Sequence, residues 1–143
     1  MFDQLTEFTG NHPMMMMAFM ALLVLTVLNE VKLATQRFAG LTPASAVQKM
    51  NNEESAVVLD VREPAETAGG KISKAVQIPV SSIKQRIGEL DRYKNSTIIV
   101  YCKTGNRSSI ACKALNQAGF EKVYNLNGGI TAWQDAQLPV SKK

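Results

Sequence analysis

The chain has 143 residues, 45% of them hydrophobic, and a formal net charge of +4 at pH 7, so a packed core is feasible and global disorder is not expected. Acidic and basic residues are interspersed and few aromatic residues lie beside them, which argues against nucleic-acid binding. The one histidine, His12, lies near the N-terminus, so the globular part has no Cys-His or Ser-His pair and no zinc cluster, and we expect no metal or cofactor.

An uncharged apolar run at residues 14–28 dominates the N-terminal part of the chain. At a rise of about 1.5 Å per residue it extends about 22 Å, short of a hydrocarbon core of about 30 Å. Extending the helix from Pro13 to Leu33 supplies the missing length and places Glu30 and Lys32 at the interface, where charged groups are tolerated. We therefore expect a short tail at residues 1–12, a single transmembrane helix at residues 13–33 and a linker at residues 34–40.

Three other interpretations of this segment stay open: a cleaved signal peptide, a buried core helix and an interfacial helix. A signal peptide needs a basic start, whereas Asp3 and Glu7 precede the run. Lys32 and Arg37 follow it and no Lys or Arg precedes it, so the positive-inside tendency predicts a single-pass protein of the inner (cytoplasmic) membrane whose globular domain faces the cytoplasm. The two isolated cysteines agree, because they suit a reducing compartment.

Strand and helix patterns alternate at short intervals through the rest of the chain. Thr42 is a good N-cap and Pro43 a good first helical residue, so a helix should run to about residue 50. Strands are predicted at residues 57–59, 76–78, 97–101 and 123–126, and further helices at residues 81–87, at residues 108–118 and around Trp133. This alternation is typical of an α/β fold with a mainly parallel sheet, in which ligands bind at the carboxyl ends of the strands.

The strongest strand meets the strongest helix at a loop that contains Cys102, Lys103, Thr104, Gly105, Asn106, Arg107 and Ser108. A cysteine at this place faces the amides of a helix N-terminus, which favour the thiolate over the thiol. Lys103 and Arg107 add positive charge, so the pKa of Cys102 is expected below its ordinary value of about 8.5. Cysteine is also a common core residue, and Cys112, in the middle of the helix, is expected to be one. Trp133 is likewise expected to pack in the core rather than to contact a ligand.

Three motifs in this order resemble the rhodanese domain: LDVRE at residues 59–63, CKTGNRS at residues 102–108, and Gly128-Gly129 followed by Trp133. The intervening positions that match are Glu66, Gly70, Ile72, Ala75 and Pro79. The resemblance spans about residues 41–138, and we place the domain at residues 41–143. It implies a three-layer domain around a central, mainly parallel sheet.

The resemblance also implies a sulfurtransferase. The Cys102 thiolate would take the outer sulfur of a small anionic donor such as thiosulfate, and the resulting persulfide would pass it to a thiol or protein acceptor. The amides of residues 103–108 would hold the outer sulfur. Asp60 is expected to order the site and Arg62 to pair with Glu66, unless these two are surface charges of little effect. One departure is Lys71, which stands where many members have histidine.

The loop residues carry further expectations. Lys103 is the best candidate for attracting an anionic donor. Arg107 either shares that role or braces the loop by pairing with a carboxylate, and Ser108 is expected to be both a helix cap and a donor to the sulfur. Arg107 follows Cys102 in a C-x4-R spacing, whereas phosphatases with a catalytic cysteine use C-x5-R.

Three functions therefore compete. The first is a sulfurtransferase that turns over. The second is a sulfur carrier without turnover, or a membrane-tethered interaction module. The third, an arsenate reductase or phosphatase, is disfavoured by the shorter loop.

Overall fold

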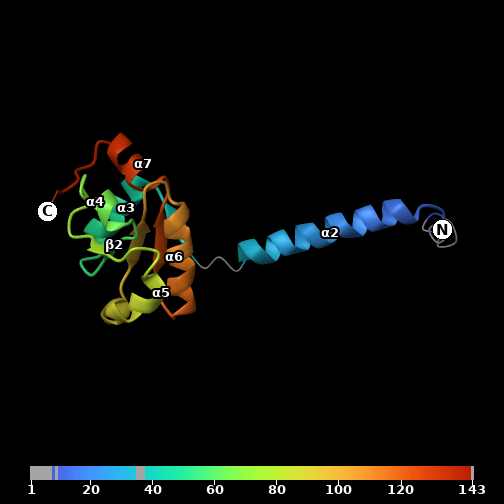
Figure 1. Cartoon of the computed structure of the whole chain (residues 1–143), viewed down its shortest axis with the longest axis horizontal. Coiled ribbons are helices and arrows are strands. Elements are labelled where there is room, and N and C mark those ends of the chain that lie inside the picture. The colour runs from blue at the N-terminus through green and yellow to red at the C-terminus, as the bar shows by residue number, and fades with distance from the viewer. Residues whose placement is uncertain (1–7, 9, 35–37, 143) are drawn as a thin grey trace. The chain divides into compact units, whose positions relative to one another are not determined.

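The computed structural model describes residue 8, residues 10–34 and residues 38–142, with the backbone alone at residues 32–34 (Figure 1). It divides into two compact units, Met1–Gln36 and Arg37–Lys143. Each unit has its own internal contacts.

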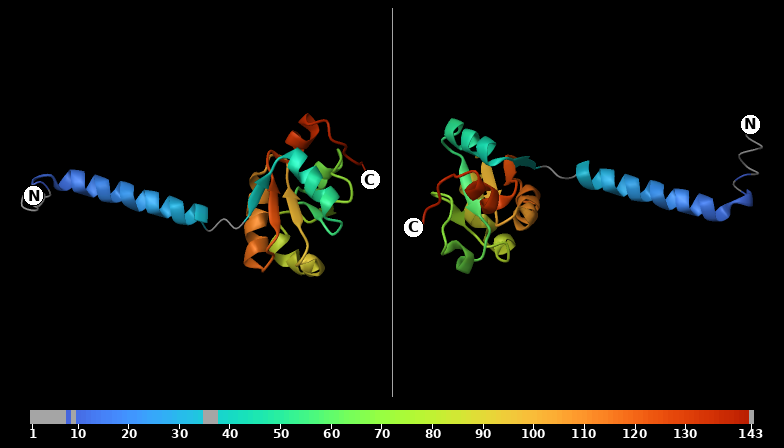
Figure 2. Two further views of the ribbon diagram at one scale, coloured as in Figure 1. Left: turned by 180° about the vertical axis from the view of Figure 1, so that it is seen from behind. Right: turned by 90° about the horizontal axis from the view of Figure 1, so that it is seen from above.

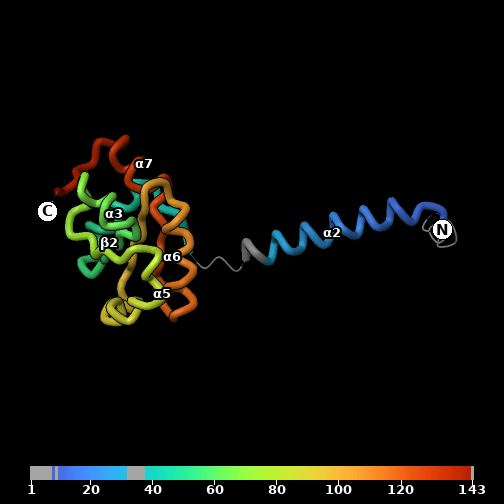
Figure 3. The backbone as a smooth tube through the Cα atoms, viewed as in Figure 1, coloured from blue at the N-terminus to red at the C-terminus, as the bar shows by residue number. Residues whose placement is uncertain are grey.

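Helix α2 (Pro13–Ala34) forms the N-terminal unit and covers the helix predicted at residues 13–33 (Figure 3). Its stretch Pro13–Val31 is long and apolar enough to cross a membrane, and none of it is buried. The hydroxyl of Thr26 donates to the carbonyl of Leu22 at 2.9 Å, so this polar side chain is satisfied inside the helix. Such internal pairing suits an apolar surrounding. The anchoring role of α2 stays a prediction.

A parallel sheet of five strands, in the order β1-β5-β4-β2-β3, forms the centre of the globular unit. The strands are β1 (Ala39–Leu41), β2 (Val57–Asp60), β3 (Val76–Gln77), β4 (Ile98–Tyr101) and β5 (Val123–Leu126). Central strand β4 is buried along its whole length, because both faces of the sheet are covered. The predicted parallel sheet is confirmed.

Strand β1 was not predicted, and two of its three residues fall in the expected linker. Three residues with the sequence Ala-Gly-Leu have no alternating pattern of their own. They are extended because they pair with Tyr124, Asn125 and Leu126 of the neighbouring strand β5. Tertiary pairing, not local propensity, therefore decides this segment.

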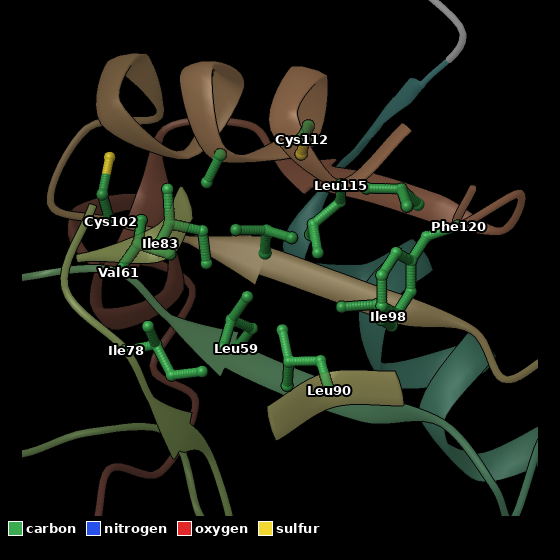
Figure 4. Packing of buried hydrophobic residues seen from close by; sticks show 13 residues of the cluster. Leu59, Val61, Ile78, Ile83, Leu90, Ile98, Cys102, Cys112, Leu115 and Phe120 are labelled. Carbon is green, nitrogen blue, oxygen red and sulfur yellow. The ribbon is translucent and has the colours of Figure 1, made fainter. Parts of the chain in front are cut away.

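Helices cover the two faces of the sheet and produce the predicted three layers (Figure 2). One apolar cluster lies against α5 (Ile83–Arg86), the 3-10 helix η1 (Ile87–Tyr93) and α6 (Asn106–Gln117), and includes Leu59, Ile98 and Leu115 (Figure 4). The other lies against α3 (Pro43–Asn52) and α7 (Gly129–Asp135) and includes Ile99 and Trp133. Thr42 caps α3 as predicted, since its hydroxyl accepts the amide of Ser45 at 3.2 Å.

The carboxyl ends of the strands meet at one edge of the sheet. Strand β2 leads there to the short helix α4 (Pro64–Thr67), β4 leads to Cys102, and β5 leads to the glycine pair at the start of α7. Three segments that are far apart in the sequence therefore converge on the end of the central strand.

Candidate active site

Cys102 follows directly after strand β4 and belongs to the first apolar cluster, with no exposed surface. Its sulfur accepts the backbone N–H of Gly105 at 3.0 Å, and the hydroxyl of Ser108 lies 3.4 Å away. Figure 4 shows this sulfur beside the first turn of α6, whereas the sulfur of Cys112 extends from the middle of that helix towards the sheet. The cysteine thus accepts main-chain amides, as its loop position predicts, and it is also buried, which was not predicted.

The two cysteines are both buried, yet their acidities differ. Burial raises the pKa of Cys102, but the Ser108 hydroxyl and the backbone N–H groups of Ser108, Gly105 and Thr104 lower it, and the result is a pKa below the ordinary value. Burial raises the pKa of Cys112, and the nearby charge of Cys102 raises it further. Hydrogen-bond donors around the sulfur, rather than exposure, separate the more acidic thiol from the less acidic one.

The loop turns at Gly105, whose φ of +103° lies in the left-handed region. Gly105 occupies the N-cap position of α6, and the helix begins at Asn106. The prediction that Ser108 caps the helix is therefore wrong, because Ser108 already lies inside the first turn. Ser108 was also expected to donate to the sulfur, and its hydroxyl does lie 3.4 Å from Cys102 Sγ.

Asn125 of strand β5 binds this turn through its side chain, and no sequence pattern predicted this role. Its side-chain N–H donates to the Gly105 carbonyl at 3.2 Å and to the Ser109 hydroxyl at 3.0 Å, and its oxygen accepts the Ser108 hydroxyl at 2.6 Å. Asn125 is buried, so unpaired amide groups there would be costly. The one available signal was a polar residue in an otherwise apolar strand.

Helix α7 holds the other side of the loop. The amide of Ile130 donates to the Cys102 carbonyl at 2.9 Å, and the amide and hydroxyl of Thr131 donate to the Lys103 carbonyl at 3.2 Å and 3.0 Å. These carbonyls therefore face α7, which leaves the amides that follow free to face the sulfur. A Cβ atom at Gly129, which has φ +59°, would lie 2.4 Å from the Cys102 carbonyl oxygen, so only glycine fits there.

Asp60 and Arg62 form a buried ion pair, with 2.7 Å between Arg62 Nη2 and Asp60 Oδ2. The hydroxyl of Tyr101 donates to the same carboxylate at 2.7 Å and accepts the amide of Ile72 at 3.0 Å. This network fixes the residue before Cys102. The predicted pairing of Arg62 with the Glu66 carboxylate is wrong, since Arg62 reaches only the Glu66 carbonyl, at 3.3 Å.

The Glu66 carboxylate instead binds Arg107, with two N···O distances of 2.6 Å and 2.7 Å. Of the two roles expected for Arg107, the structure shows the brace by a carboxylate. The Arg107 guanidinium lowers the pKa of Glu66 to about 2, so the pair is charged at neutral pH. The amide of Glu63 also donates to Glu66, at 3.0 Å, which orients the carboxylate.

Lys103, Thr104 and Asn106 are exposed on the loop. Within the described part of the chain, no carboxylate pairs with the ammonium group of Lys103. A cavity of about 270 Å³ lies beside it, lined by Arg62, Glu66, Gly69, Gly70, Lys103, Ile130, Thr131 and Gln134. The described residues contain no group of His, Cys, Asp and Glu that could hold a metal ion.

Comparison with known proteins agrees with this geometry. Residues 42–136 match the family model of the rhodanese-like domain. The uncharacterized protein YibN of Escherichia coli strain K12 is 31% identical over 139 residues, 96% of each chain, so that similarity extends into α2. A sulfurtransferase of Allochromatium vinosum is 40% identical over 96 residues, 67% of this chain and 88% of that one. The crystal structure of a rhodanese-related protein from Thermoplasma volcanium has 29% identity and a TM-score of 0.67, covering 74% of this chain and 100% of that one.

The lowered pKa of Cys102 predicts how its alkylation depends on pH. Thiolate is the reactive form, so iodoacetamide should modify Cys102 at a lower pH than an ordinary thiol, and Ser108→Ala should move the midpoint upward because a donor is lost. Cys112 should stay unmodified in the folded protein. Peptide mass spectrometry over a pH series measures both sites. Equal modification of the two cysteines at every pH would contradict this account.

Gly129 predicts a second, independent effect. Gly129→Ala should lower the free energy of unfolding by about 2 kcal/mol or more, because it combines positive φ with a clash against the Cys102 carbonyl. Gly69→Ala is the matched control, since a Cβ there meets no atom within 4 Å, and should change stability by less than about 0.5 kcal/mol. Urea unfolding followed by the fluorescence of Trp133, the only tryptophan, measures both. Equal effects of the two substitutions would refute the proposed packing.

Proposed function

The chain belongs to the rhodanese-like domain family, and from this premise we propose that Cys102 carries sulfane sulfur as a persulfide in a sulfurtransferase reaction. One observation carries the proposal: a buried sulfur that accepts a main-chain N–H at 3.0 Å and lies beside a hydroxyl and the start of a helix. This surrounding stabilises negative charge on sulfur without a histidine.

The reaction has two steps in which charge and atoms balance. The Cys102 thiolate attacks the outer sulfur of thiosulfate, the S–S bond of the donor breaks, and sulfite leaves with the electron pair. The outer sulfur of the Cys102 persulfide is then attacked by an acceptor. Cyanide gives thiocyanate, and a thiolate gives a new persulfide, and in either case Cys102 returns as thiolate.

The loop amides support the intermediate as well as the resting thiolate. The extra sulfur adds one more anionic acceptor in front of the turn at Gly105, and the amides of residues 103–108 are its proposed donors. No proton transfer is needed while the thiolate is preformed, so the reaction requires no general base. Since Cys102 has no exposed surface, a donor reaches its sulfur only when neighbouring side chains move aside.

The direct test uses the full-length chain in mild detergent with thiosulfate and cyanide. Thiocyanate should form, Cys102→Ser should abolish it, and Cys112→Ser, which removes a core thiol outside the site, is the matched control that should retain most of it. A persulfide on Cys102 that forms without turnover assigns the carrier role instead. An unreactive Cys102, with neither persulfide nor thiocyanate, would falsify both.

We also propose that α2 anchors this domain in the inner membrane with the domain on the cytoplasmic side. The support is the exposed apolar stretch Pro13–Val31 and the basic residues Lys32 and Arg37 that follow it. In a bacterial host, alkaline phosphatase fused at the C-terminus should be inactive and green fluorescent protein at the same place should fluoresce. The opposite pair of results reverses the orientation, and release of the full-length chain by high salt excludes the spanning helix.

A further inference from the structure

The cavity beside the loop is lined by charged side chains of both signs. These are Arg62, Glu66 and Lys103. Arg62 is neutralised by Asp60 behind the cavity wall, and Glu66 neutralises Arg107 of the catalytic loop. Within the described part of the chain, Lys103 is therefore the cation of this region that no carboxylate compensates.

Glu66 is held in this arrangement by its surroundings. Its carboxylate receives the amide of Glu63 as well as both terminal nitrogens of Arg107. The Glu63 carboxylate accepts the hydroxyl of Ser81 at 3.0 Å, and its negative charge also acts on Arg107. An anionic donor that approaches Arg107 must therefore compete with the Glu66 carboxylate, which the Glu63 amide and Arg107 itself already hold in place.

The size of the cavity also limits what can bind there. Its volume of about 270 Å³ lies just below the range, roughly 300–1,000 Å³, of pockets for drug-sized ligands, so it suits a smaller organic group. Besides the charged groups, Ile130, Thr131 and Gln134 line it, and Gly69 and Gly70 leave one wall without side chains. Such a mixed surface suits an organic group as well as an ion.

We infer that the cavity receives the organic group of a singly charged sulfur donor, and that Glu66, by occupying Arg107, selects such donors over the doubly charged thiosulfate ion. This inference rests on the proposed function. Glu66 acts as a specificity-determining residue, because it sets how much positive charge the donor meets while Cys102 performs the same reaction on either donor.

Benzenethiosulfonate is a suitable probe, since it carries one negative charge, an organic ring and a terminal sulfur like that of thiosulfate. The Cys102 thiolate attacks the terminal sulfur, the bond between the two sulfur atoms breaks, and benzenesulfinate leaves with the electron pair. The same persulfide results from both donors. Any difference between them therefore reports donor binding and approach rather than the later transfer to cyanide.

The test compares kcat/KM for thiosulfate and benzenethiosulfonate in the full-length chain, with cyanide as acceptor. Glu66→Gln keeps an oxygen for the amide of Glu63 but frees the charge of Arg107. The ratio of thiosulfate to benzenethiosulfonate should rise about three- to tenfold, the effect of one additional charge pair at close range in partly screened surroundings. Arg107→Gln should lower the ratio, because it leaves Glu66 uncompensated.

Glu89→Gln is the matched control. It removes the same charge and also breaks an exposed pair with an arginine, Arg86, in the helical segment from Ile83 to Tyr93, so the ratio should stay unchanged. Turnover of both donors with the same ratio in wild type, Glu66→Gln and Arg107→Gln overturns this inference and leaves the proposed function intact. Absence of a Cys102 persulfide with either donor in the wild type overturns both.

Discussion

The acidity of the Cys102 thiol, on which the proposed chemistry depends, is set by main-chain amides that point at one buried sulfur. Burial by itself makes a thiol less acidic, as the raised pKa of Cys112 shows. At Cys102 the donors of Ser108, Gly105 and Thr104 outweigh burial, and the pKa falls instead. Cys102 therefore combines burial with stabilisation of negative charge on its sulfur, which is what the proposed persulfide requires.

Amides can point at the sulfur only because other groups hold the loop from outside. Asn125 binds the Gly105 carbonyl from strand β5, and the first amides of α7 bind the carbonyls of Cys102 and Lys103. The parallel order of the sheet brings β4 and β5 together, so both supports arrive at the same edge. The glycines in this region, with positive φ, allow backbones to approach as closely as this requires.

The charges around the site follow a similar logic. Two arginines next to the loop are each held by a carboxylate, Arg62 by Asp60 and Arg107 by Glu66. The Arg62–Asp60 pair is buried, so it contributes little net stability, but removing one partner would leave an uncompensated charge and would be costly. The pairs thus fix the shape of the loop and its wall, and among the described residues no carboxylate pairs with Lys103.

Local patterns were sufficient for much of this description, because strands, helix ends and glycine turns depend on neighbours in the sequence. The alternation of elements, the apolar N-terminal helix and the cysteine loop all follow from such patterns. The resemblance led us to expect that Arg62 pairs with Glu66, yet Arg62 precedes α4 and turns back to Asp60. Strand β1, the Glu66–Arg107 pair across 41 positions and the Asn125–Ser108 bond across 17 were decided only by the tertiary structure, since contacts between distant segments leave no periodic trace in the chain.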